Sequence, residues 1–78
     1  MNIIKIIKSE NEFISHVYDK DLNLMESKTF TDNHTTNFYL QTLPRKFKTR
    51  KTLLIVHDKD RNAVNLLIAE DEDSLFIS

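Results

Sequence analysis

Two short acidic segments carry the residues best suited to metal chemistry. The pattern Asp-Lys-Asp-x-Asn occurs at residues 19–23 and again at 58–62, and it places oxygen ligands at the first, third and fifth positions, as in the opening of a calcium loop. A calcium loop also needs Gly at its sixth position and a bidentate acid at its twelfth, and both copies have apolar residues there. We therefore predict two glycine-free hairpin turns, whose Asp and Asn side chains bond to their own backbone, and no metal site.

The histidines His16, His34 and His57 are the other candidates for acid–base or metal chemistry. His57 is close to Asp58 and Asp60, a set that would suit a metal-dependent nuclease. On a strand, however, His57 and Asp58 point to opposite faces, and no second acidic cluster or His-x-x-x-His motif supports such a site. The chain also lacks the glycine that phosphate-binding loops need, and no Ser lies in a nucleophile elbow. We expect no enzyme activity and no cofactor, and the nuclease is a remote alternative.

The strongest functional signal is the basic segment at residues 45–51. Five cations and one aromatic ring in seven residues suit contacts with several phosphates, or with an acidic protein surface. The plainer alternative is a solvated connection between a helix and a strand, with the aromatic ring turned into the core. The candidate binding residues are Arg45, Lys46, Phe47, Lys48, Arg50 and Lys51.

An acidic patch follows at Glu70, Asp71, Glu72 and Asp73. The whole chain has a net charge of −1, and this patch would repel a nucleic-acid backbone unless it lies on the far side from the basic segment. We interpret the patch either as a charged turn that protects a sheet edge or as a mimic of phosphate spacing that enters a partner's nucleic-acid groove. Opposite charges and exposed edge strands would also permit a symmetric homodimer.

The elements that position these residues form one domain, because 78 residues suffice for a single hydrophobic core. Cysteine is absent, which excludes disulfides and thiolate metal sites. Strands are predicted at 2–8, 12–19, 22–30 and 52–57 from β-branched runs or alternating apolar residues. The first is expected to be central and buried mostly on both faces. With no glycine available, the left-handed positions of the turn near residue 21 are expected to fall to Asp or Asn.

One helix is predicted from Asn33 to Leu43, with capping side chains at 31–33 and a stop at Pro44. Residues 63–69 fit either a helix or a strand, and the repeated acidic turn before them favours a returning hairpin strand.

A short terminal strand is expected at 75–77. Together the elements predict an α+β domain at 1–78: an antiparallel sheet of about five strands in the order β-β-β-α-β-β, with one helix packed on one face.

The order strand, two antiparallel strands, helix and a further strand ending in Asp58 resembles the first half of a ribonuclease-H-like domain, over residues 2–58. That family carries an acid in its first strand and a Glu in the helix. Here the first strand offers Lys5 and the helix has no acid after Asp32, so the resemblance implies no catalysis.

Composition bears on the kind of protein. The chain is rich in Asn, Ile and Lys, as AT-rich codons produce, and short chains of this kind are common in phages and mobile elements. No signal segment opens it and its apolar runs are strand-sized, so we expect a cytoplasmic protein without membrane contact. We predict a small non-enzymatic binding protein, such as a phage accessory protein or inhibitor, that occupies a host macromolecule through protein–protein contact. The alternative is a nucleic-acid-binding regulator that uses the basic segment.

Overall fold

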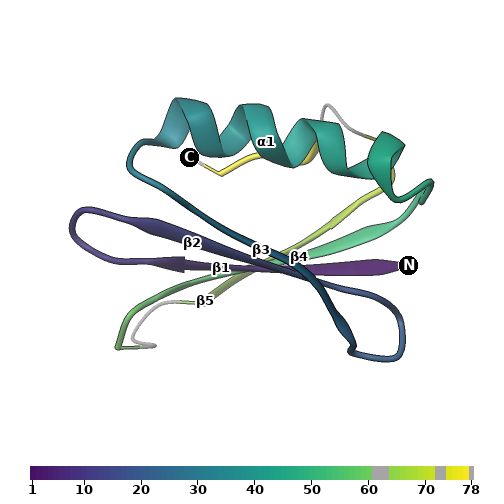
Figure 1. Cartoon of the computed structure of the whole chain (residues 1–78), viewed down its shortest axis with the longest axis horizontal. Coiled ribbons are helices and arrows are strands. Elements are labelled where there is room, and N and C mark those ends of the chain that lie inside the picture. The colour runs from purple at the N-terminus through teal and green to yellow at the C-terminus, as the bar shows by residue number, and fades with distance from the viewer. Residues whose placement is uncertain (61–63, 72–73, 78) are drawn as a thin grey trace.

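The computed structural model describes residues 1–60, 64–71 and 74–77, and it has the α+β class expected from the sequence. Figure 1 shows the helix lying along one side of a twisted sheet, with the last residues of the chain running beside it. Residues 64–69 are a strand, which decides between the two alternatives for this segment. Within the described residues the elements are β1 (Asn2–Lys8), β2 (Phe13–Tyr18), β3 (Leu24–Phe30), α1 (Asn33–Lys46), β4 (Thr52–Asp58) and β5 (Val64–Ala69).

The sheet is mixed, so the prediction of an antiparallel sheet is wrong. Its strand order is β3-β2-β1-β4-β5, with β1 and β4 parallel and all other neighbours antiparallel. The helix α1 carries the chain from the edge strand β3 to the far side of β1, so β4 arrives beside β1 in the same direction. A helical crossover is the usual connection between parallel neighbours, and it puts β1 at the centre, as predicted.

The helix continues past the predicted stop at Pro44, which lies inside its last turn. At the other end Asp32 is the N-cap, and its carboxylate accepts from the Thr35 backbone N–H at 2.7 Å. Pro44 removes one backbone donor, but contacts on both sides of it hold the last turn. Leu43 is buried in the core, and its carbonyl accepts from the Phe47 N–H at 2.9 Å. Tertiary packing therefore outweighs the local preference to end the helix.

The core lies between the sheet and α1, and β1 is covered on one side alone. Ile4 and Ile6 are fully buried, whereas Ile3, Lys5 and Ile7 are half-buried. The prediction that β1 is buried mostly on both faces is confirmed fully on the helix side alone, because its residues on the second face are only partly buried and that face has no covering layer in the part of the chain that the structure describes. The buried cluster consists of Ile4, Ile6, Val17, Tyr39, Leu40, Leu43, Leu54, Ala69, Leu75 and Ile77.

The predicted terminal strand at 75–77 does not form. Leu75 and Ile77 are buried in the core, and the backbone of Ile77 pairs with the side chain of Asn37 on α1. The Asn37 amide donates to the Ile77 carbonyl at 2.8 Å, and its oxygen accepts from the Ile77 N–H at 2.6 Å. One asparagine thus supplies the donor and the acceptor that a neighbouring strand would offer.

Candidate interaction surfaces

The open face of the sheet, which we define as the face turned away from α1, carries mainly apolar side chains. Strand side chains alternate between faces, and the register of each strand pair places the half-buried or exposed apolar positions together on this side. Exposure rises toward β5, where three of these side chains are more than half exposed. The apolar members are Ile3, Ile7, Ile14, Tyr18, Leu53, Ile55, Val64, Leu66 and Ile68.

A single lysine occupies the centre of the open face. Lys5 lies opposite His16 on β2 and beside Ile55 on β4. No Asp or Glu of the described strands shares this face, and Lys5 has no ion-pair partner among the described residues. The open face is therefore an apolar surface with one unneutralised positive charge in the middle.

A hollow of about 290 Å³ lies on the same face. It is lined by Ile3, Lys5, Tyr18, Leu22 and Ile55. Leu22 comes from the turn between β2 and β3, is 67 % exposed, and has a left-handed backbone with φ of 66°. The prediction that Asp or Asn would take the left-handed position of this turn is thus wrong. A leucine is held there at a conformational cost, and its side chain borders the hollow.

The first acidic segment is a hairpin turn, as predicted. The Asp19 carboxylate accepts from the backbone N–H groups of Asp21 and Asn23, both at 2.9 Å. These bonds, led by that from Asn23, hold the pKa of Asp19 below its ordinary value. The Asp19 carboxylate therefore stabilises the turn. The second segment, at 58–62, falls partly outside the described residues.

His57 and Asp58 do not assemble a metal site. His57 is buried, and its Nδ1 donates to the backbone carbonyl of Asp58 at 2.8 Å, which leaves Nε2 buried without a partner. Asp58 and Asp60 line a wide hollow at the ends of β1 and β4 instead. Across the described part of the chain, no three His, Asp or Glu residues are grouped so that they could hold a metal ion.

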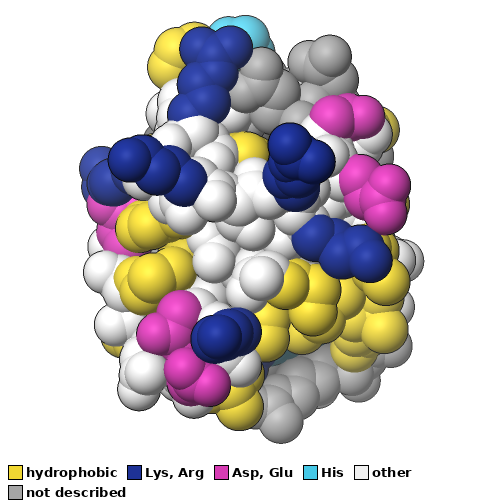
Figure 2. Space-filling view, turned by 90° about the vertical axis from the view of Figure 1, so that its right-hand side faces the viewer, with side chains coloured by type: hydrophobic (Ala, Val, Ile, Leu, Met, Phe, Trp, Pro, Cys, Tyr) yellow, Lys and Arg dark blue, Asp and Glu magenta, His cyan; other side chains and the backbone are white. Residues whose placement is uncertain are grey.

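The basic segment forms the end of α1 and the loop before β4. Its five cations are exposed, whereas Phe47 is half-buried against the core, as the plainer alternative for this segment supposes. Lys48 has φ of 50°, in the position after the helix where glycine is usual. Figure 2 shows this end of the molecule, with Lys and Arg side chains spread between Asp and Glu side chains, and hydrophobic side chains gathered in its lower part.

Glu70, the first residue of the acidic patch, lies beside the basic segment and not on the far side from it. Because Thr52 pairs with Ala69 in the β4–β5 ladder, Lys51 and Glu70 come together, with Nζ and Oε1 3.9 Å apart. Asp71 accepts from the Ser74 backbone N–H at 2.8 Å, in a local turn. The rest of the patch, residues 72–73, lies outside the described residues. The described part therefore places a carboxylate beside the cations.

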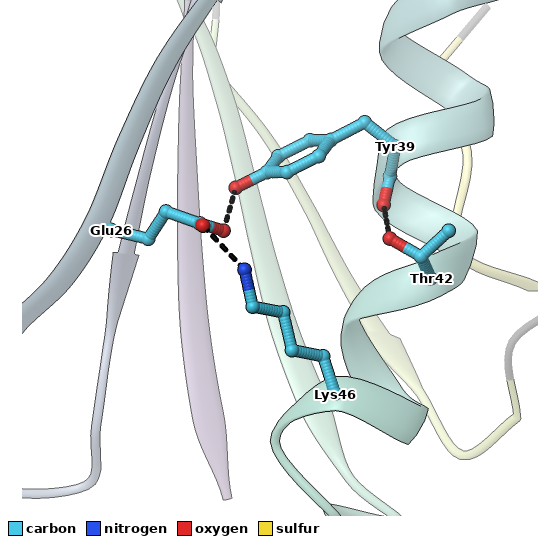
Figure 3. Close-up of polar contacts among 4 residues, drawn as sticks. All are labelled: Glu26, Tyr39, Thr42 and Lys46. Atoms are coloured by element: carbon cyan, nitrogen blue, oxygen red, sulfur yellow. Dashed lines mark hydrogen bonds and ion pairs between the residues drawn. The ribbon is translucent and has the colours of Figure 1, made fainter.

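A polar cluster between β3 and α1 was not anticipated from the sequence (Figure 3). The Tyr39 hydroxyl donates to Glu26 at 2.6 Å, and Lys46 donates to the other oxygen of Glu26 at 2.5 Å. The bonds from Lys46 and then Tyr39 lower the pKa of Glu26, while burial and then Glu26 raise the pKa of Tyr39. The sequence signal was present, since Glu26 and Lys28 share a strand face with Phe30. The cluster fastens β3 to the helix.

Comparison with models of known protein families and with curated proteins finds no match to this sequence. Within the described residues, no helix has the length and apolar character to cross a membrane.

Proposed function

We propose that this chain is a small non-enzymatic binding protein of phage or mobile-element type, which occupies a host protein in the cytoplasm through the open face of its sheet. The observation that carries the proposal is the apolar character of that face. The four strands that carry these apolar side chains, about 4.8 Å apart and about 20 Å long, span on the order of 300 Å². Continuous apolar patches of this size on soluble proteins commonly mark a contact surface. Composition supports the phage or mobile-element origin.

The chemistry of the open face specifies a partner surface. That surface is apolar, with one large side chain that enters the hollow beside Leu22 and a carboxylate that faces Lys5. An anchor in a central pocket and a charge pair shielded by apolar neighbours are the features that concentrate binding energy in protein interfaces. The left-handed Leu22 supports this assignment, because a turn that served stability alone would hold Asn or Gly there.

The basic segment is a weaker candidate for the principal contact. Lys46 is paired with Glu26 and Lys51 lies near Glu70, so carboxylates reduce the positive potential that a phosphate backbone requires. Nucleic-acid binding is therefore the alternative outcome of the test, and Lys48 and Arg50 are the residues that test it with the least disturbance of the fold.

Affinity capture with three baits tests the proposal: the wild type, Lys5→Glu on the open face, and Lys48→Glu/Arg50→Glu on the basic segment. A host lysate, with and without nuclease treatment, is passed over each bait and captured proteins are identified by mass spectrometry. The binding constant of the purified candidate is then measured. We expect Lys5→Glu to weaken binding at least about tenfold and the basic-segment variant to bind as the wild type does. Loss with the basic-segment variant alone, or capture that vanishes on nuclease treatment, contradicts the assignment.

A further inference from the structure

The edge strand β5 exposes unpaired backbone and apolar side chains together. β5 borders a single neighbour, β4, so the N–H and C=O groups on its outer side have no strand to bond. On the open face Val64, Leu66 and Ile68 are 55 %, 68 % and 62 % exposed. No residue of β5 is charged, and its register with β4 runs without a bulge. Within β5 itself, therefore, no charge, proline or bulge protects the edge.

Apolar side chains are also found on the helix side of this edge. A groove of about 200 Å³ lies there, and Val56, Leu67 and Phe76 line it together with Lys8 and Asn65. Phe76 is 52 % exposed and Leu67 is 37 % exposed, although both flank the core. A strand added beside β5 would therefore meet apolar side chains above and below the sheet, in addition to the free backbone groups.

We infer that β5 pairs antiparallel with β5 of a second copy of this chain, around a two-fold axis at Leu66. The second copy is favoured because β5 complements itself. With no charge on the strand, the pairing places no like charges opposite each other, and on the open face apolar residues meet apolar residues. Centred on Leu66, the pairing sets Val64 opposite Ile68 of the other copy on the open face, and Asn65 opposite Leu67 on the helix side.

The two-fold axis of such a pair stands perpendicular to the sheet, so the dimer has one continuous ten-stranded sheet with both open faces on the same side. Two hollows beside Leu22 then face the same direction, and a dimeric or repetitive partner would bind more tightly through both. The edge-to-edge pairing rests on the outer backbone of β5, whereas the proposed host contact is centred on Lys5 and the hollow beside Leu22, so the two can be tested separately.

Cysteine cross-linking tests the register directly, since the natural chain has no cysteine. In a pair centred on Leu66 the two Leu66 Cα atoms are about 4.5–5.5 Å apart, within the range of a disulfide. Two Leu67 Cα atoms are roughly 8 Å apart in the same pair, beyond that range. We expect Leu66→Cys to form a disulfide dimer on mild oxidation, Leu67→Cys alone not to, and a mixture of Asn65→Cys with Leu67→Cys to cross-link.

Sedimentation measures whether the dimer forms without a cross-link. The edge is small beside a standard interface, so we expect a dissociation constant on the order of 10–100 μM for the wild type and a monomer at every concentration for Leu66→Lys. Lys20→Leu, an uncharged substitution in the exposed turn between β2 and β3, is the matched control and should dimerise as the wild type does.

A wild type that stays monomeric up to about 1 mM overturns the proposal, as does equal cross-linking of Leu66→Cys and Leu67→Cys. If the wild type is monomeric but Leu66→Lys loses a captured host protein, Leu66 belongs to the host contact and the dimer is wrong. Failure of the host-capture experiment with a dimer still present would reject the proposed function and leave this inference standing.

Discussion

The two edge strands of this sheet are built in opposite ways. The β3 edge carries Glu26 and Lys28, its pairing with β2 is interrupted by a register shift, and Glu26 is bonded to two residues of α1. The β5 edge has no charge and an unbroken register with β4, and most of its large side chains are more than half exposed. Charges and bulges prevent a strand from pairing with another chain, so β3 is protected and β5 is open to association.

This difference shows that the two sides of a very small domain can depend on different contacts. A chain of 78 residues without cysteine has a limited core, and an additional contact is a common requirement at this size. The β3 side is completed within the chain by the helix and the Glu26 cluster. Both proposals place the contacts with another molecule on the β5 side and the open face.

The largest effect should come from removing the residue that joins the protected edge to the helix. Tyr39 is 8 % exposed, packs against Phe30 at a ring-centroid distance of 4.9 Å and bonds to Glu26. We expect Tyr39→Ala to lower the free energy of unfolding by about 3–5 kcal/mol, because it leaves a large cavity and removes one of the two hydrogen bonds to the Glu26 carboxylate. Urea denaturation, followed by circular dichroism, measures the loss.

Leu66→Ala on the β5 edge is the matched comparison. Because Leu66 is 68 % exposed, its truncation should change the free energy of unfolding by no more than about 0.5 kcal/mol at concentrations where the protein is monomeric. If Tyr39→Ala and Leu66→Ala lower the free energy of unfolding equally, the β3 edge is no more important to stability than the β5 edge.

A smaller loss is expected from Glu26→Gln, which keeps the shape of the cluster and removes its charge. The amide oxygen of glutamine can still accept from Tyr39 or Lys46, but the charge-assisted part of both bonds is lost. We expect a loss of about 1–2 kcal/mol at neutral pH by urea denaturation. The same substitution should leave dimer cross-linking through Leu66→Cys unchanged, and a loss of cross-linking would contradict the separation of the two edges.

Acid should remove the difference between Glu26→Gln and the wild type. The folded protein holds the pKa of Glu26 below its ordinary value of 4.5, so the carboxylate contributes its full stability above that pH. As the pH falls below 4.5 the unfolded chain binds the proton first, and the contribution disappears once the folded carboxyl is protonated. Parallel denaturation series from neutral pH downward should therefore converge. A gap that persists in strong acid would show that the substitution acts through packing and not through charge.

Local patterns predicted the elements well because each depends on neighbouring residues. Alternation and the repeated acidic turn found the strands, and Asp32 was among the expected caps of the helix. The parallel pairing of β1 with β4 was missed, because it depends on where the crossover helix returns the chain. The C-terminal end of the helix was predicted too early, because the burial of Leu43 outweighs the tendency of Pro44 to end a helix.

The surfaces were harder to predict than the elements. The sequence drew attention to the basic segment, whose charges are visible locally, whereas the open face depends on the register of all five strands. A run of isoleucines does not reveal which face of β1 is the more deeply buried, with Ile4 fully buried and Ile3 only partly buried. The Glu26 cluster likewise joins residues that only the folded chain brings together.

The smallest effect separates stability from binding at one residue. Leu22 is held in a left-handed conformation that Asn tolerates better, so Leu22→Asn should raise the free energy of unfolding by about 0.5–1 kcal/mol. The same change removes an apolar side chain from the rim of the hollow and should weaken capture of a host protein. Leu24→Asn on the same hairpin, where φ is not positive, is the control and should bring no gain in stability. If Leu22→Asn raises the free energy of unfolding and leaves host capture unchanged, Leu22 takes the left-handed position only because the chain has no glycine. If Leu22→Asn lowers the free energy of unfolding, the Leu22 side chain stabilises the fold by packing. In either case the open face would need a different anchor.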